Sequence, residues 1–344
     1  MNHCLIFKNP TVYDNDLTPH TLKYLVAENG RISYMGDAAP AVEGEVVDCS
    51  GKTVLKPFCD HHYHLPGSML YDLFGVNLCE YGVSEYADAF AAVSRELKAV
   101  RGFGWEVHAM KRYFSSSEKT PQELLDEAFP HRPAVIFSLD FHSCWCNSLA
   151  LAQLKAEGVA LGFADREIPG GEGCIFHEAA VEDIFKSPVL GFCTGEIESA
   201  ILAEQKRLLA RGISEVFSLV FIGASYFTVL EVLKAMDQRG LIRLKIHFSY
   251  TVFPDVTAEA FRENVAKSLT YQSERLIFAG VKLYADGVID NHSAVLLRPY
   301  EDGAECGRPM WENDALARVL ALAEESGLAV HIHAYKHRQW APGR

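Results

Sequence analysis

The chain has 344 residues, of which 49% are hydrophobic and 22% are charged, and its formal net charge is −13. These proportions exclude a disordered or fibrous chain, and the acidic balance argues against nucleic acid as a partner. The length suits one large α/β barrel domain preceded by a small module better than it suits three domains.

Cysteine usage and the N-terminus indicate the compartment. The 9 cysteines are an odd number and show no C-x-x-C spacing, which is typical of reduced thiols rather than of a disulfide framework. The first residues lack a basic segment followed by a long apolar one, and no apolar run approaches the roughly 18 residues of a membrane span. We therefore predict a cytoplasmic protein with no membrane partner.

Residues 1–58 predict a small β-module. Short strand-like runs alternate with turns, and Asn29-Gly30 between two apolar runs is a strong hairpin signal. The expected strands cover residues 4–7, 24–27, 32–35 and 46–47.

Residues 59–344 alternate between helical and strand-like patterns, which favours βαβ units and a parallel sheet. The expected helices cover residues 86–100, 197–211, 228–238 and 314–326. The expected strands cover residues 133–139, 215–221, 241–250 and 328–333. The stretch 101–130 and the glycine-rich loop at 169–173 hold few apolar residues, so we expect insertions without a core of their own.

The segment Asp60-His61-His62-Tyr63-His64 carries the strongest chemical signal. Side chains alternate along a strand, so His62 and His64 point to one face and can reach one divalent ion, whereas His61 faces away. The chain has 14 histidines, so chance alone gives about half of one such pair. The alternative interpretation is a pair of hydrogen-bonded core histidines.

Two later strands supply candidate partners. His331-Ile332-His333 lies in an apolar run, and either histidine could be the ligand. Lys282 interrupts another apolar run and could instead pair with Asp286. Lys245, in the strand-like segment 241–250, is its rival for the same role.

These blocks together resemble the amidohydrolase superfamily, and in particular its YtcJ-like branch, amidohydrolase family 3. The match rests on the order and separation of motifs along most of the chain. They are Phe58 to His64, Leu139 to Ser148, Pro169-Gly170-Gly171, His177 to Ala180, Gly280 to Gly287, and His331 to Ala334. The resemblance implies an α/β fold of the (β/α)8 TIM-barrel type spanning residues 59–344, with residues 1–58 forming the N-terminal half of a β-sandwich.

The resemblance also implies the chemistry. A divalent metal, with zinc the expected ion in one or two copies, would activate water to hydrolyse carbon-nitrogen bonds of a small-molecule substrate. The implied metal ligands are His62, His64, His333 and Lys282, the lysine being carbamylated and bridging. The implied catalytic residues are Lys282, Asp140 and His142, the last two beside the substrate, with Trp145 and Asn147 supporting their loop. From the residues alone, Asp140 and His142 could equally form a loop hydrogen bond.

The match departs from the family after the fifth strand, because residues 335–344 fit nothing in its pattern. We therefore expect an incomplete barrel of strands 1–5 that lacks a histidine ligand and the aspartate base. This predicts low activity, poor solubility and an exposed sheet edge that favours homo-oligomers. The alternatives are an inactive metal-binding or regulatory remnant and a barrel enzyme that needs no metal.

Overall fold

The computed structural model describes residues 4–14, 16–159, 161, 164–165, 168–177, 181, 184–185, 187–289, 293–300 and 306–335. The chain divides into two compact units, Met1–Phe58 and Cys59–Arg344. Each unit is described below by itself.

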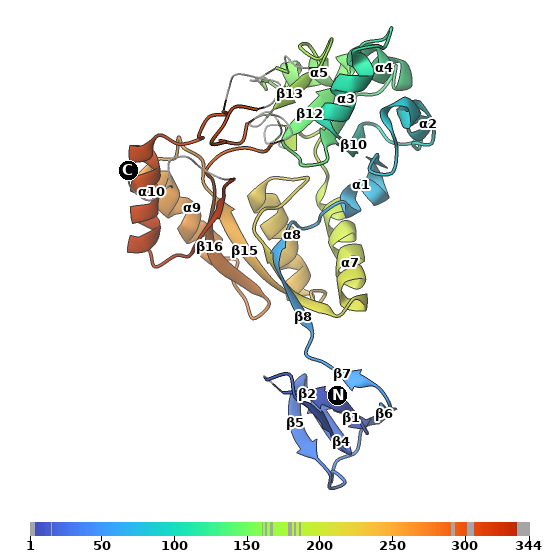
Figure 1. Ribbon diagram of the computed structural model, residues 1–344, viewed down its shortest axis with the longest axis vertical. Helices are drawn as coiled ribbons and strands as arrows, with labels where there is room; N and C mark the ends of the chain where they lie inside the picture. The colour runs from blue at the N-terminus through green and yellow to red at the C-terminus, as the bar shows by residue number, and fades with distance from the viewer. Residues whose placement is uncertain are drawn as a thin grey trace. The chain divides into compact units, whose positions relative to one another are not determined.

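The first unit consists of two small sheets (Figure 1). One sheet has the order β5-β4-β1-β6, and the other has the order β3-β2-β7. Their strands are β1 (Cys4–Lys8), β2 (Thr11–Tyr13), β3 (Pro19–Thr21), β4 (Tyr24–Glu28), β5 (Arg31–Gly36), β6 (Glu45–Asp48) and β7 (Thr53–Val54).

The hairpin predicted at Asn29-Gly30 is confirmed. Strands β4 and β5 pair antiparallel with Glu28 opposite Arg31, so these two residues form the turn. Both have positive φ, 52° at Asn29 and 79° at Gly30. That conformation matches the right-handed twist of the flanking strands, and asparagine and glycine adopt it at the lowest cost.

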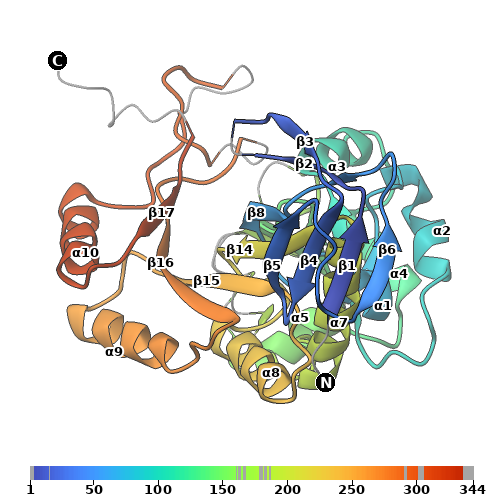
Figure 2. The ribbon, with the colours of Figure 1, turned by 90° about the horizontal axis from the view of Figure 1, so that it is seen from below.

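The second unit is built on a five-stranded sheet with the order β17-β16-β15-β14-β8. Read from β8, the strands follow chain order, and β14 to β17 are parallel to one another. The strands are β8 (Phe58–Tyr63), β14 (Ile213–Ser218), β15 (Lys245–Thr251), β16 (Leu276–Tyr284) and β17 (Val330–His333). Figure 2 shows the row of strands curving, as in part of a barrel.

Helices connect successive strands and cover the outside of this curved sheet (Figure 2). They are α7 (Thr194–Ala210), α8 (Tyr226–Gln238), α9 (Ala258–Leu269) and α10 (Asn313–Glu325). Alternate strand residues such as Val216, Ile246 and Phe248 are buried in one cluster with apolar residues of α7 and α8. Val281 and Leu283 are buried with residues of α9 and α10. Lys282 lies between the last two, so its side chain is directed to the opposite, concave face of the sheet.

A second five-stranded sheet, β13-β12-β11-β10-β9, forms between β8 and β14 of the chain. Its strands are β9 (Val76–Asn77), β10 (Val100–Trp105), β11 (Ala134–Ser138), β12 (Ser143–Cys146) and β13 (Ile175–His177). The helical segments in this part are α1 (Met69–Phe74), η1 (Val83–Glu85), α2 (Tyr86–Ala91), α3 (Val107–Phe114), α4 (Pro121–Ala128) and α5 (Ser148–Ala156).

This sheet corrects three expectations. The strand predicted at 133–139 belongs to it and not to the barrel sheet. The helix predicted over 86–100 ends at Ala91, with Ala92 as its C-cap; turns and bends follow, and Val100 already starts β10. The insertion also has a core of its own, in which Trp105, Met110 and Leu125 are fully buried with Trp145.

Within the ranges given above, no helix combines the length and apolar character needed to cross a membrane.

Candidate functional site

The first two predicted ligands lie at the carboxyl end of β8. The ring centroids of His62 and His64 are 5.1 Å apart. Burial lowers the pKa of His64 to about 4, with the charges of His62 and Lys282 adding to the effect. Burial and the Lys282 charge also lower the pKa of His62. Both imidazoles are therefore neutral near pH 7, the form that binds metal.

His61 has separate contacts. Its ring stacks on Phe217 of β14 with centroids 5.0 Å apart, and Phe217 in turn stacks on His247 of β15 at 4.0 Å. This aromatic row gives His61 a packing role away from the His62 and His64 pair.

Lys282 lies in β16 and is only 2% exposed. Burial lowers the pKa of its amine to about 8. Among the residues that the structure describes, it has no ion-pair partner, and its Nζ lies 5.2 Å from the centroid of the Tyr284 ring. Asp286, the expected alternative partner, instead accepts hydrogen bonds from the backbone N–H groups of Val295 and Tyr335.

The rival lysine has a different environment. The Lys245 side chain is 46% exposed, and its Nζ lies 3.5 Å from Oε1 of Glu215. The structure therefore makes Lys282 the buried lysine and Lys245 a partly solvated member of an ion pair.

The β17 histidines lie beside Lys282. In the parallel pairing of β16 and β17, His331 is opposite Lys282 and His333 is opposite Tyr284. Burial, together with the charge of Lys282, lowers the pKa of each histidine.

Three of these histidines share one hydrogen-bonding pattern. Nε2 of His333 donates to the carbonyl of Gly287 at 3.1 Å, which leaves Nδ1 with its lone pair. His64 hydrogen-bonds the backbone of Val220, and its buried Nδ1 has no partner among the described residues. His331 likewise hydrogen-bonds the backbone of Ala279, and its buried Nε2 has no partner in the described part of the chain. A metal-binding histidine usually donates one ring N–H to a carbonyl and ligates through the other nitrogen.

Asp140 and His142 come from the second sheet, in the hairpin loop between β11 and β12. Asp140 Oδ1 accepts hydrogen bonds from the Ser138 hydroxyl at 2.5 Å and from the His142 backbone N–H at 2.9 Å. The His142 ring lies 6.1 Å from the His333 ring and 6.2 Å from the Tyr284 ring, centroid to centroid. A cavity of about 180 Å³ adjoins the loop and is lined by Asp140, Ser138, Leu139 and residues of the segment Trp105 to His108.

The predicted residues are thus gathered as neighbours but not as a complete coordination sphere. Over the described part of the chain, no three His, Cys, Asp or Glu side chains are close enough to hold one ion. The charge of Lys282 acts on the histidine pairs of both β8 and β17.

Trp145 and Asn147 support the second sheet rather than the loop directly. Nε1 of Trp145 donates to the carbonyl of Pro121 at 3.1 Å. Asn147 is fully buried at the start of α5, and its amide makes four hydrogen bonds to backbone groups.

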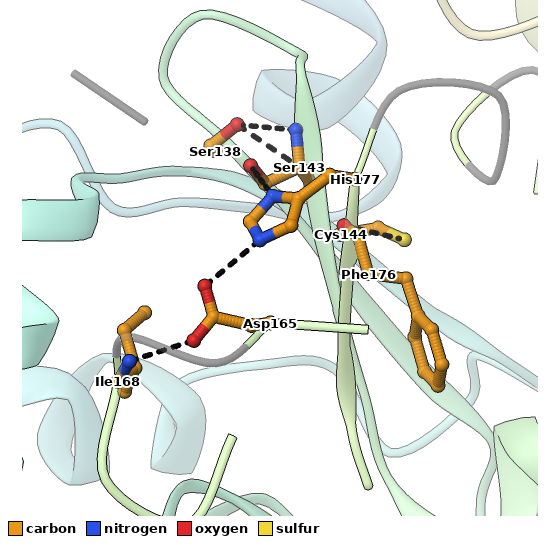
Figure 3. A network of polar contacts seen from close by, with 7 residues as sticks. All are labelled: Ser138, Ser143, Cys144, Asp165, Ile168, Phe176 and His177. Atoms are coloured by element: carbon orange, nitrogen blue, oxygen red, sulfur yellow. Dashed lines mark hydrogen bonds and ion pairs between the residues drawn. The ribbon is translucent and has the colours of Figure 1, made fainter. Parts of the chain in front are cut away.

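A polar network next to the loop escaped the sequence analysis. His177 lies between Ser143 and Asp165, with Nδ1 at 2.7 Å from the serine Oγ and Nε2 at 2.8 Å from the aspartate Oδ2 (Figure 3). His177 stood in a motif that carried the family resemblance, but nothing in its sequence context assigned it a partner. Glu178, the next residue of that motif, lies outside the described residues.

Comparison with known proteins decides the family. The model of the amidohydrolase family matches residues 45–341. The chain belongs to the amidohydrolase family. The match covers the barrel sheet, the second sheet and all six predicted site residues.

Individual relatives are distant. The exoenzymes regulatory protein AepA of Pectobacterium carotovorum is 25% identical over 96% of this chain and 73% of its own length. YtcJ of Bacillus subtilis, named as an amidohydrolase, is 24% identical over 85% of this chain and 55% of its own length. A crystal structure of an uncharacterized metal-dependent hydrolase from Pyrococcus horikoshii superimposes with a TM-score of 0.69 at 24% identity, covering 96% of this chain and 65% of that one. This likeness shows a shared fold, an α/β unit with a curled, parallel half-barrel sheet.

Proposed function

We propose that this amidohydrolase is a metal-dependent hydrolase that cleaves carbon-nitrogen bonds of a small molecule by means of metal-activated water. The observation that carries the proposal is the buried side chain of Lys282, which has no ion-pair partner among the described residues, beside His64 and His331, each of which has a buried ring nitrogen without a described partner. A buried polar atom without a partner is costly, so such a cluster needs a ligand that the side chains themselves do not supply.

The donor atoms of these residues are of the kinds that bind divalent ions, with zinc the expected choice. His62, His64 and His333 would supply neutral imidazole nitrogens, and His331 is the alternative to His333 on β17. When bound, the metal would supply Lewis-acid chemistry, lowering the pKa of water and polarising the scissile carbonyl.

Lys282 would contribute after reaction with carbon dioxide. A pKa of about 8 leaves an appreciable fraction of the amine neutral near pH 7. The neutral amine attacks CO₂, a nitrogen-carbon bond forms, and one proton leaves to solvent, so that an anionic carbamate with two oxygens results. The desolvated site disfavours the ammonium ion, and a cation alongside would favour the carbamate.

Asp140 and His142 would bind and orient the substrate. The hydrogen bonds to Asp140 fix its carboxylate, and the loop holds the His142 ring 6.1 Å from that of His333. From this position His142 could hydrogen-bond a substrate carbonyl or leaving group.

The proposal also covers the architecture of each unit, the cellular location and the oligomeric state. We propose that β8 and β14 to β17 are strands 1–5 of a (β/α)8 TIM-type barrel and that the first unit is half of a β-sandwich. We also propose that the protein is cytoplasmic and associates into homo-oligomers.

The second candidate is a metal-binding regulator without turnover. The name of AepA, a regulatory protein, favours it.

The two candidates separate in one experiment. The protein is stripped of metal, reloaded with Zn²⁺ and assayed against a panel of amides and N-acyl amino acids. We expect hydrolysis that a chelator abolishes and that Lys282→Ala lacks, with Lys245→Ala as the matched control. Stoichiometric zinc with no turnover would favour the regulator, and turnover that resists chelation would contradict both.

A further inference from the structure

We propose that His177 is a positioning residue: clamped between Asp165 and Ser143, it fixes the hairpin loop that presents Asp140 and His142 to the candidate centre. The role of His177 in presenting Asp140 and His142 rests on the proposed function, whereas the hydrogen bonds that hold the loop do not.

His177 is held through both of its ring nitrogens. Nε2 lies 2.8 Å from Oδ2 of Asp165, and Nδ1 lies 2.7 Å from the hydroxyl oxygen of Ser143. Asp165 is itself held, because its Oδ1 accepts the backbone N–H of Ile168 at 2.6 Å.

The network continues from Ser143 into the loop. The Ser143 backbone N–H donates to the Ser138 Oγ at 2.9 Å, and the Ser138 hydroxyl donates to Asp140 at 2.5 Å (Figure 3 shows the serine pair). Asp140 then accepts the backbone N–H of His142. Five hydrogen bonds in series therefore connect Asp165 to His142.

The loop needs such support because its backbone is strained. Phe141, between Asp140 and His142, has a φ of 61°, which is a costly conformation for a bulky residue. Its ring packs against Tyr71, Phe103 and Phe137, so apolar contacts hold one side of the loop and the His177 network holds the other.

The arrangement resembles a serine nucleophile with its base, but burial argues against that use. Ser143 is fully buried at the start of β12, and Asp165 is 2% exposed. A substrate carbonyl cannot reach the serine Oγ, which leaves a positioning role as the one that the contacts support.

The test uses two variants of the full chain and follows His142 directly. His177→Phe keeps a ring of similar size and removes both hydrogen bonds, and Ser143→Ala removes only the hydroxyl. His131→Phe, at an exposed turn of the same unit, is the matched control. The readouts are the imidazole ¹H–¹⁵N signals of His142, assigned by their loss in His142→Gln, together with zinc stoichiometry and, where turnover is found, kcat and KM.

We expect one narrow set of His142 signals in the unmodified protein and in His131→Phe, and broadened or multiple sets in both test variants, with zinc stoichiometry unchanged. Turnover should fall about 100-fold in kcat for His177→Phe, as for a misplaced catalytic group. His177→Asn, which can still meet the Ser143 hydroxyl, should recover part of the loss. His142 signals that are unchanged in both variants, or already heterogeneous in the unmodified protein, would overturn the inference. A protein that binds zinc without turnover would end the proposed function, while the His142 signals would still decide the role of His177.

Discussion

At the scale of single residues, the candidate centre depends on Lys282. Folding lowers the pKa of its amine from 10.5 to about 8 because burial disfavours the charged form. The folded, metal-free protein is therefore less stable with a lysine at this position than it would be with an apolar side chain of similar length. Selection for stability alone would not favour a lysine at this position, whereas a role in binding a metal would.

This argument predicts the effect of Lys282→Met in metal-free, CO₂-free buffer. At pH 7 we expect the free energy of unfolding to rise by about 1 to 3 kcal/mol, because the penalty for a buried ammonium is removed. A lowered folded pKa means that the unmodified protein gains stability as the pH rises from about 8 to 10.5, so the difference should vanish near pH 10.5. Urea denaturation at pH 7 and pH 10.5 measures both values. Lys245→Met, at a partly solvated site, should change stability by no more than about 0.5 kcal/mol, and an equal gain there would contradict the explanation.

Asn147 gives a second test at this scale. Three of its hydrogen bonds join the start of α5 to the backbone of β11 and of the segment before it, and the fourth caps α5 at the Ala150 N–H. Asn147→Ala removes a helix cap and leaves buried backbone groups unpaired, so we expect a loss of about 2 to 4 kcal/mol in unfolding free energy. Asn313→Ala, at the exposed first position of α10, is the control and should cost less than about 0.5 kcal/mol. Similar losses for the two variants would show that the Asn147 contacts do not matter.

At the scale of elements, an ion pair connects strand β10 to helix α7. Arg101 of β10 donates from both terminal nitrogens to the carboxylate of Glu196 in α7, at 2.7 and 3.0 Å. Arg101 is 6% exposed, and its guanidinium lies 4.1 Å from the centroid of the Phe192 ring. Helix α7 covers the barrel sheet and β10 belongs to the inserted sheet, so this pair fixes one against the other.

Breaking the pair should be expensive. Glu196→Gln leaves a buried guanidinium without its counter-ion, and we expect a loss of about 3 kcal/mol in unfolding free energy. Glu198→Gln, on the same helix, breaks the exposed pair with Arg239 and should cost less than about 1 kcal/mol. Thermal or urea denaturation of both variants measures these losses. Equal losses in unfolding free energy would contradict the role assigned to the pair of Arg101 and Glu196.

The same pair predicts a pH dependence. Burial alone would raise the pKa of Glu196, but the hydrogen bonds from Arg101 and from the Cys193 backbone outweigh it, and the net pKa is below 4.5. A lowered carboxylate pKa contributes stability above the unfolded value that is lost as the pH falls through the folded value. The stability difference between the unmodified protein and Glu196→Gln should therefore shrink below about pH 4.5 and stay constant from pH 6 to pH 8. A difference that is independent of pH across this range would contradict the sign of the shift.

The elements also show where sequence patterns succeed and fail. The helix and strand pairs from 197 to 250 and from 314 to 333 were predictable because each helix ends near a glycine and each strand is continuously apolar on its helix-facing side. The prediction of a helix over 86–100 placed the end of the helix wrongly. The helical spacing of apolar residues continues up to the next strand, and periodicity alone does not show where one element ends. The membership of Ala134–Ser138 in the second sheet depends on pairing with β10 and β12, which no local pattern encodes.

At the scale of the whole molecule, the spatial gathering of the site was predictable only in part. Alternation along β8 placed His62 and His64 together, and the apolar run around Lys282 indicated its burial. The family resemblance supplied the connection between distant strands and the loop of Asp140 and His142. The clamp of Asp165, His177 and Ser143 was not predictable, because it requires the register that sets Ser143 opposite His177 across β12 and β13.

The central claim is that His62, His64, His333 and Lys282 hold a divalent metal. Its most direct test is equilibrium dialysis of the metal-stripped chain against micromolar Zn²⁺, with bound zinc measured by mass spectrometry. The account predicts one or two zinc ions per chain, and a loss of at least one ion in His64→Asn and in Lys282→Ala but not in His61→Asn or Lys245→Ala. A chain that retains no zinc, or one whose zinc content is unaffected by both site variants, would contradict it.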